Sequence, residues 1–522
     1  MKALLMHRDR DFDLQQGLPR HERDLMKDLE LNTLLSAMAG KDSFVFDVSQ
    51  KALLLGLQND ADTILYRQEI VKDCLKNPVV VRELYALAVE AIEGKRKHYL
   101  GIFCRWPGGV LYEAINLLDM LVDMLRKLRD IADRHAGRFE SSGFTTLFAM
   151  LQKELTDEYF ASVRSHLTEL KFRHGVLVSA KLGQGNAGAN YVLRQARGKR
   201  PNWLKRILGL APPAYTFRLA ERDQTGARIL SEMRDRGINL VANALAQSTD
   251  HILSFFGMLR TDLAFYVGCL NLNDKLAAIS APISFPRPEA MGTRGHCFSQ
   301  LYDVCLALTM GRSVVGNTLD ADGKGLVIVT GANQGGKSVF LRSIGLAQLM
   351  MQCGMFVAAE SFAAELCAGL FSHYKREEDA TMKCGKLDEE LGRMSDIAGA
   401  IAPNSMLLFN ESFASTNERE GSEIARQIVC ALLERRVKVF FVTHLYEFAR
   451  GFFDQKREDA IFLRAERLAD GTRTFKLVEG EPLETSFGED VFREVFSPAS
   501  VSACARDAHG GPGDQPPPIQ AA

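Results

Sequence analysis

Apolar positions recur every three or four residues through most of the first half of the chain. Between 24 and 278 this spacing predicts amphipathic helices, because such positions fall on one face of a helix. One long helix is expected from Ile238 to about Leu270. It is apolar on so many sides that most of it must be buried. The clearest apolar face of a single expected helix, an apolar seam, contains Leu111, Ile115, Leu118, Val122, Leu125, Leu128 and Ala132.

The pattern of the chain then changes twice. Residues 175–220 combine a strand-like run at Val176–Val178 with glycines and prolines, which indicates strands and loops. From about 280, short apolar runs alternate with helices, as is typical of an α/β domain with a mainly parallel sheet. The expected strands lie at 325–330, 405–409 and 437–442, followed by a hairpin at 461–478.

These patterns predict a multidomain fold, in which a mainly α-helical region precedes an α/β domain. A glycine- and proline-rich end cannot form a core and is expected to be disordered. The predicted divisions are a lead-in at 1–23, a helical domain at 24–278, an α/β domain at 279–498 and a tail at 499–522.

Composition narrows the class of protein without identifying a partner. The 522 residues carry a net charge of −1, with 46% hydrophobic and 25% charged residues, as in ordinary soluble globular proteins. Charges follow the first apolar residues too early for a signal peptide, and no uninterrupted apolar run is long enough to span a membrane, so we expect a cytoplasmic location. The ten cysteines include no C-x-x-C pair, which argues against a zinc or redox motif.

A glycine-rich segment carries the strongest chemical signal. It fits the phosphate-loop pattern G-x-x-x-x-G-K-[ST] and lies between an expected strand and an expected helix, which is the context that this motif requires. Its backbone amides would surround phosphate oxygens, Lys337 would reach the β and γ phosphates of ATP, and Ser338 would offer its hydroxyl to Mg²⁺. The predicted nucleotide-binding residues are Gly331, Ala332, Asn333, Gln334, Gly335, Gly336, Lys337 and Ser338.

Two other strands end in polar residues suited to the same site. The strand at 405–409 is followed by Asn410 and Glu411, and a carboxylate there can polarise the water that attacks the γ-phosphate. The strand at 437–442 is followed by Thr443 and His444, where a polar residue can sense that phosphate. We therefore predict Glu411, His444 and Lys337 as catalytic residues.

Together these segments resemble the MutS-related ATPases, the ABC-class family of DNA mismatch repair. The further matching residues are Ser415, Thr416, Gly421 and Ser486–Gly488. The resemblance implies a helical core and lever region before an ABC-type ATPase domain, ATP and Mg²⁺ as cofactors, a head-to-tail homodimer around ATP, and DNA as the partner. It also implies that Val315 and Asn317 begin an adenine-contacting loop, and that a signature at 382–388, including Gly385, reaches the nucleotide of the partner subunit.

The chain departs from the family pattern at three points. Asn410 stands where the family usually has an aspartate that holds the Mg²⁺ water shell, so the metal site would consist of Ser338 and an uncharged amide. Cys384 stands where the signature usually has serine. The expected helical core begins almost at once, which predicts that the N-terminal mismatch-reading domain is missing.

Two weaker signals complete the analysis. Residues 183–188 fit G-x-G-x-x-G, but the sequence after them is a poor helix start, which favours a tight turn between strands over a dinucleotide site. A basic segment at 194–206 contains Arg197, Lys199 and Arg200, which either bind the phosphate backbone of DNA without reading sequence or form a solvated loop.

The leading functional hypothesis is therefore a DNA-binding ATPase of mismatch repair or of DNA-structure recognition. The alternative is a nucleotide-gated interaction scaffold with little hydrolysis, which Asn410 favours and which Glu411 and His444 oppose. A phosphate-loop kinase for a small molecule is a third reading, but it leaves the long helical half without a role.

Overall fold

The protein is described from a computed structural model that covers residues 1–98, 106–173, 175–194, 216–376, 385–468 and 471–484. The chain divides into two units, of which one contains residues 1–14 and 69–270 and the other contains residues 15–68 and the chain from 271 onward. The divisions fall within helices α4 (Ala61–Lys76) and α10 (Gln224–Ala278).

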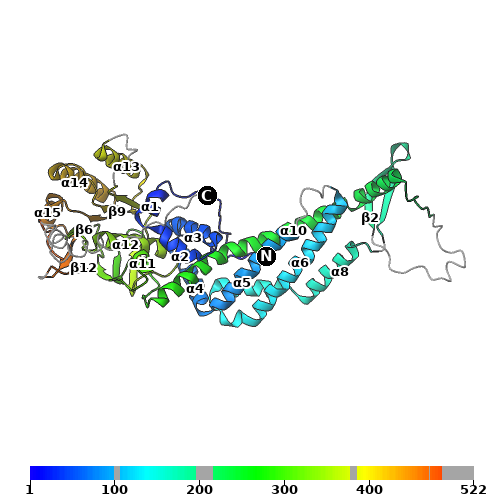
Figure 1. Cartoon of the computed structure of the whole chain (residues 1–522), viewed down its shortest axis with the longest axis horizontal. Coiled ribbons are helices and arrows are strands. Elements are labelled where there is room, and N and C mark those ends of the chain that lie inside the picture. The colour runs from blue at the N-terminus through cyan, green and yellow to red at the C-terminus, as the bar shows by residue number, and fades with distance from the viewer. Residues whose placement is uncertain (99–105, 174, 195–215, 377–384, 469–470, 485–522) are drawn as a thin grey trace, which may run out of the picture. The chain divides into compact units, whose positions relative to one another are not determined.

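The first unit is built mainly of helices. Helix α6 packs against α5, α7 and α8 (Figure 1), and all seven residues of the predicted apolar seam are buried along it. Pro107 occupies its first turn. Proline is tolerated there because the backbone N–H that it lacks would have no partner within the helix. The bounds are α5 (Pro78–His98), α6 (Pro107–His135), η3 (Ala136–Arg138), α7 (Ser142–Glu154) and α8 (Asp157–Leu170).

An antiparallel hairpin interrupts the helices of this unit. Strand β1 (Leu177–Leu182) pairs with β2 (Gly188–Arg194), and a single turn, η4 (Gln184–Asn186), connects them. Gly185 has a φ of 64°, a backbone conformation that glycine adopts without steric cost. The prediction of a tight turn at 183–188 is confirmed.

Helix α10 is longer than the apolar pattern predicted. Its polar beginning, where Arg228 and Glu232 form an i,i+4 ion pair at 3.6 Å, extends the helix before the apolar stretch. Among the described residues, this is the one helix with an 18-residue stretch apolar and long enough to cross a membrane, and 72% of that stretch is buried inside the protein. A core helix of a soluble protein has the same properties.

The second unit contains a six-stranded sheet in the order β12-β11-β6-β10-β9-β8. Neighbouring strands are parallel, except that β12 runs antiparallel to β11 as a closing hairpin. The predicted parallel sheet and the predicted hairpin are both confirmed. The bounds are β6 (Leu326–Gly331), β8 (Leu370–Tyr374), β9 (Met406–Asn410), β10 (Lys438–Val442), β11 (Ala460–Arg467) and β12 (Arg473–Glu479).

Helices cover both faces of this sheet (Figure 1), so its central strands are apolar on both sides. On one face, Phe409 and Phe441 stack with ring centroids 4.7 Å apart beneath the helices that follow β9 and β10. On the other face, the helix after β6 contacts β9 and β10. The helices are α12 (Lys337–Gln352), α13 (Lys386–Ala400), α14 (Glu418–Glu434) and α15 (Tyr446–Asp454).

A second, four-stranded sheet in the order β3-β7-β4-β5 contains both parallel and antiparallel pairs. Helix α11 follows β4, and the loop between α11 and β5 belongs to the candidate site described below. The bounds are β3 (Arg287–Glu289), β4 (His296–Leu301), α11 (Val304–Met310), β5 (Asn317–Asp320) and β7 (Ser361–Glu365).

The compact units differ from the predicted domain division near the N-terminus. Residues 15–68, most of which we assigned to the helical domain, belong to the α/β unit, where α1 contacts β8, α2 contacts α11 and α3 contacts α12. Helical periodicity identifies an apolar face but does not reveal the element that covers it. The bounds are α1 (Glu22–Asp28), α2 (Leu31–Ala39), α3 (Ser43–Leu55) and η1 (Gly56–Gln58).

Leu29 illustrates this packing and allows a test of it. Its side chain is fully buried against Gly345 of α12, where even an added Cβ would lie 2.8 Å from Leu29 Cδ2. We expect Leu29→Ala to lower the free energy of unfolding by about 2–5 kcal/mol through the lost contacts and the cavity. Leu65, which is 45% exposed, supplies the control, because Leu65→Ala should cost about 0.5 kcal/mol or less. Denaturant unfolding followed by intrinsic fluorescence measures both, and equal losses would contradict the packing of residues 15–68 on the α/β unit.

Candidate functional site

The predicted phosphate loop connects the end of β6 to the start of α12. Gly331 and Gly336 have φ values of 105° and 89°, which residues with a Cβ rarely adopt. The loop also lies very close to β11, since a Cβ on Gly335 would be 2.6 Å from the Cβ of Ala465. These glycines are therefore required by backbone conformation and by space, and the loop has the shape that the sequence predicted.

Lys337, the first residue of α12, is buried at the base of this loop with 5% of its surface exposed. Its Nζ donates hydrogen bonds to the backbone oxygens of Gly331 and Ala332, both at 2.9 Å. Burial lowers the pKa of Lys337 to about 8, because the charged form has lost part of its hydration. The ammonium group is thus held in place by the loop that surrounds it, ready to exchange carbonyl partners for phosphate oxygens.

Ser338 and Asn410 meet beside the loop. Ser338 Oγ donates a hydrogen bond to Asn410 Oδ1 at 3.0 Å, which links the start of α12 to the last residue of β9. A hydroxyl and an amide oxygen are ligands that Mg²⁺ accepts, and the remaining positions of its octahedron are commonly filled by phosphate oxygens and water. The described residues contain no cluster of three or more His, Cys, Asp or Glu side chains that could hold a metal. The pair therefore fits an ion carried in with a nucleotide, and does not form a protein cage.

Glu411 and His444 lie at the same edge of the sheet. Nε2 of His444 is 2.9 Å from Oε1 of Glu411, and a carboxylate is an acceptor only, so this nitrogen carries the proton. That hydrogen bond is the main reason that the pKa of Glu411 is lowered below its usual range, although burial opposes it. Glu411 has a φ of 55°, and its N–H donates to the carbonyl of Val442 at 2.9 Å. The carboxylate is thus kept ionised and oriented as a hydrogen-bond acceptor for water.

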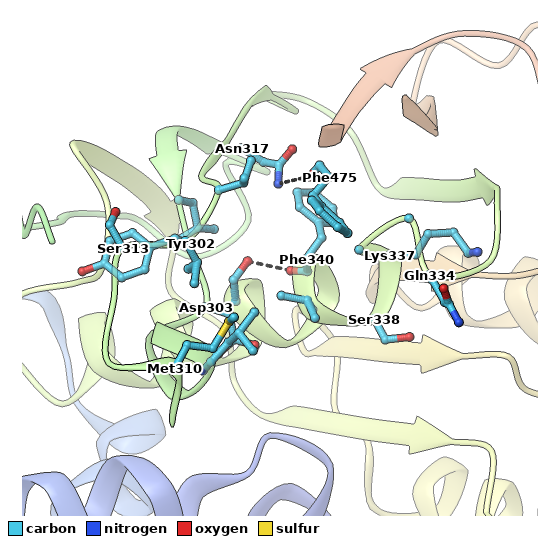
Figure 2. Close-up of a pocket in the computed structure, with 18 of the residues that line it drawn as sticks. Tyr302, Asp303, Met310, Ser313, Asn317, Gln334, Lys337, Ser338, Phe340 and Phe475 are labelled. Atoms are coloured by element: carbon cyan, nitrogen blue, oxygen red, sulfur yellow. Dashed lines mark hydrogen bonds between the residues drawn. The ribbon is translucent and has the colours of Figure 1, made fainter. Parts of the chain in front are cut away.

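A cavity of about 710 Å³ opens beside these groups. Figure 2 shows Gln334, Lys337 and Ser338 toward one end of it and Met310 and Ser313 toward the other. Its lining is polar near the loop and includes apolar side chains farther away, as expected of a pocket for a molecule with a charged end and a flat apolar end. Among the predicted residues, those that line the cavity are Val315, Asn317, Asn333, Gln334, Gly335, Gly336, Lys337, Ser338 and Glu411.

Asn317 lines the cavity but is buried, and its amide group is already engaged. Its Oδ1 accepts from the N–H of Leu477 at 2.7 Å, and its Nδ2 donates to the carbonyl of Phe475 at 3.4 Å (Figure 2). Its side chain therefore holds the hairpin strand β12 against the cavity wall, while Val315, which is 41% exposed, presents a free side chain to the cavity.

Two residues of β12 belong to the site but were missed by the sequence analysis. Phe475 lines the cavity, is 49% exposed and has a φ of 59°. Arg473 Nη1 donates a hydrogen bond to Gln334 Oε1 in the phosphate loop at 2.7 Å. The closing hairpin was predicted, but only the pairing of β11 with β6 brings it to the loop, and no local pattern signals that contact.

The predicted signature lies only partly within the described residues, because 382–384 fall outside them. Gly385 is the N-cap of α13, away from the loop in sequence, and its role toward a second subunit stays a prediction. Farther along α13, Glu390 is fully buried and its carboxylate accepts from Phe413 N at 2.9 Å and from Ser415 Oγ at 3.0 Å. This carboxylate connects the helix after the signature with the segment after Glu411.

Other predicted features lie outside the described residues and stay predictions. They are the DNA-binding candidates Arg197, Lys199 and Arg200, the segment Ser486–Gly488 and the C-terminal tail.

Comparisons with known proteins agree with this arrangement of a helical region and a phosphate-loop domain. The family described as the MutS2 N-terminal domain matches residues 59–279, and the family described as MutS domain V matches residues 327–510. A DNA mismatch repair protein MutS of Leptospira interrogans is 25% identical over 331 residues, which cover 60% of this chain and 38% of the relative.

Two further relatives show the same partial coverage. An Endonuclease MutS2 of Thermus thermophilus is 29% identical over 34% of this chain and 23% of its own length. A MutS protein homolog 4 of mouse is 23% identical over 56% of this chain and 31% of its own length. The chain thus matches well under half of the length of these relatives.

The burial of Lys337 leads to a prediction about pH. A polyphosphate binds the protonated ammonium, so binding above the pKa of about 8 requires uptake of a proton. We expect the affinity for ATP to be nearly constant from about pH 6.5 to 7.5 and to fall by up to about tenfold per pH unit well above pH 8. Isothermal titration calorimetry at several pH values measures this change. Lys337→Arg, which keeps its charge throughout, is the control, and an equally steep fall in that variant would assign the pH dependence to another group.

Proposed function

The chain belongs to the MutS-related family, and on that premise we propose that it binds ATP with Mg²⁺ at Gly331–Ser338 and hydrolyses it in order to control binding to DNA. The observation that carries the proposal is the convergence of Lys337, Ser338, Asn410 and the Glu411–His444 pair beside one cavity. Such a set supplies a phosphate cradle, oxygen ligands for a metal and an oriented carboxylate.

Each residue has a separate part in the proposed hydrolysis. The loop amides and Lys337 hold the β and γ phosphates, and Ser338 with Asn410 would hold Mg²⁺, which neutralises phosphate charge when bound. Glu411 accepts a hydrogen bond from the attacking water and orients it in line with the bond that breaks. His444 positions Glu411 through their 2.9 Å contact and keeps its carboxylate ionised.

Val315 and Phe475 form the proposed nucleoside end of the site. Both line the cavity and both are partly exposed, so an adenine ring could pack against their side chains without displacing the core. Asn317 acts indirectly, because its amide holds β12 and therefore Phe475 in place.

We infer that two copies of the chain bring the signature helix of one to the nucleotide of the other. Support comes from Glu390, whose buried carboxylate joins α13 to the segment after Glu411, so a change at the nucleotide would be transmitted to Gly385. In this arrangement ATP stabilises a homodimer and hydrolysis releases it.

Glu411→Gln tests the proposed chemistry. Since glutamine cannot act as an anionic base, we expect ATP turnover to fall by about two orders of magnitude or more while ATP binding persists. Light scattering should then show an ATP-dependent dimer most clearly in this variant, because it keeps its bound ATP unhydrolysed. Asn410→Asp is the companion variant, and it should leave turnover unchanged or raise it.

The same assays distinguish the proposed ATPase from the alternative of a nucleotide-gated scaffold. Nucleotide binding without turnover in the parent protein would favour the scaffold, and equal turnover in Glu411→Gln and the parent would place the chemistry elsewhere. A monomer with and without ATP would contradict the shared site.

We propose that DNA is held mainly through its phosphates, without sequence specificity, by the basic segment around Arg197, Lys199 and Arg200. Two observations support this proposal. The segment is positively charged, and the MutS relative of Leptospira interrogans is named a DNA mismatch repair protein. The target would be a mispair or another DNA structure such as a junction.

The salt dependence of DNA binding tests this proposal. Each phosphate contact releases counterions, so neutralising Arg197, Lys199 and Arg200 together should reduce the log–log salt slope by up to about 2.7 for duplex DNA. Fluorescence anisotropy over a salt series measures the slope, and an unchanged slope would exclude this segment as the contact. A preference for mismatched over matched duplex above about tenfold, or about 1.4 kcal/mol, would show that the chain reads mispairs directly.

A further inference from the structure

Cations outnumber carboxylates around the phosphate loop. Lys337 lies under the loop, Arg473 reaches it from β12, and the backbone N–H of Lys375 donates to the carbonyl of Asn410, next to Glu411. Among the described residues, the carboxylates that line the cavity are Glu411, which is already paired with His444, and Asp303, which is already paired with Arg342. Asn410, the partner of Ser338, is uncharged. The balance of charge at this edge of the sheet is therefore positive even before a metal binds.

Arg473 is oriented toward the loop and has donors to spare. Its Nη1 donates to Gln334 Oε1 at 2.7 Å, while its Nε is buried and has no hydrogen-bond partner among the described residues. A buried N–H without an acceptor is costly, and a guanidinium group offers a fork of donors that matches phosphate oxygens. Arg473 and Lys337 both contact the phosphate loop, Arg473 at Gln334 and Lys337 at the carbonyls of Gly331 and Ala332, so both cations act on the same small volume.

The backbone fixes Arg473 in this place. It begins β12 and pairs with Arg467 of β11, and β11 in turn pairs with β6 up to the register Ala465–Gly331, at the first residue of the loop. Gln334, which receives the hydrogen bond, has a φ of 58° and lines the cavity beside Lys337 (Figure 2). A guanidinium held by a strand loses less freedom on binding phosphate than one on a flexible loop.

Lys375 lies at the end of the strand next to β9. It follows β8, and its backbone N–H donates to the carbonyl of Asn410 at 2.9 Å, which fixes the start of its side chain beside the metal-facing residue. Its own side chain is exposed and extends from the same edge of the sheet as Glu411. It therefore adds positive potential where the γ-phosphate would lie.

The amide of Asn410 changes what a metal must do at this site. A carboxylate in that position would repel a triphosphate unless a divalent cation lay between them, whereas an amide imposes no such repulsion. In a partly buried site this difference is larger than it would be in water. Because the surrounding side chains are positive and Asn410 is neutral, Mg²⁺ is not needed to offset repulsion when a triphosphate binds. The role of Mg²⁺ in the hydrolysis step remains.

We propose that Arg473 is an additional ligand of the triphosphate and that this site binds ATP nearly as well without Mg²⁺ as with it, so that the metal serves hydrolysis and not binding. This inference rests on the proposed ATP site but concerns a separate property of it. The ligand class is a nucleoside triphosphate in its metal-free, fully anionic form.

The experiment is a titration of the full chain with ATP by isothermal titration calorimetry, once with excess Mg²⁺ and once with excess EDTA. We expect the two dissociation constants of the parent protein to agree within about fivefold, and Asn410→Asp to lose more than about tenfold in EDTA alone. Arg473→Gln should weaken binding in EDTA by about tenfold or more and by less in Mg²⁺, and Arg473→Lys should recover part of the loss.

Arg435→Gln is the matched control, because it removes the same charge from an exposed position before β10, at the edge of the sheet opposite the loop. It should bind like the parent in both buffers. Thermal unfolding of every variant without nucleotide separates loss of binding from loss of folding.

The outcomes distinguish this inference from the function on which it rests. Parent protein that binds ATP in Mg²⁺ but more than about a hundredfold more weakly in EDTA would overturn the inference and leave the ATP site intact. Failure to bind in either buffer would overturn the proposed function itself. Arg473→Gln that matches the parent in EDTA would remove Arg473 from the site.

Discussion

The parallel pairing of β6, β10 and β9 is the constraint on which the candidate site depends. Val442, the last residue of β10, lies opposite Asn410, the last residue of β9, and opposite Val329 of β6, which continues only to Gly331. Because all three strands end at that edge of the sheet, the phosphate loop, the pair Asn410–Glu411 and the pair Thr443–His444 meet there. Any shift in register would separate groups that now lie within hydrogen-bond distance.

Burial on both faces keeps this register in place. Strand residues that point to one side pack under α14 and α15, and those that point to the other side pack under α12. The same packing is what buries Lys337 and depresses its pKa, since α12 begins with that residue and is buried along most of its length. The stability of the sheet and the chemistry of the lysine therefore have one origin, which is the exclusion of water from the space between α12 and the sheet.

Two contacts extend the site beyond its loop. Asn317 secures β12 through backbone groups, and β12 then presents Phe475 to the cavity and Arg473 to the loop. Glu390 performs a comparable function on α13, where its buried carboxylate holds the segment that follows Glu411. Buried polar groups with full sets of partners are rigid, so these residues define positions for side chains that would otherwise be mobile.

Local sequence was sufficient for the features that depend on local physics. The glycine spacing of 331–336, the apolar runs that became β6, β9 and β10, and the seam of α6 follow from backbone freedom and from periodicity, and each was predicted correctly. Tertiary structure alone decided which distant segments meet: the packing of residues 15–68 on the α/β unit, and the approach of Arg473 and Phe475 to the loop. The reason is that an apolar face or a free guanidinium is encoded by neighbouring residues, whereas its partner is chosen by the packing of the whole unit.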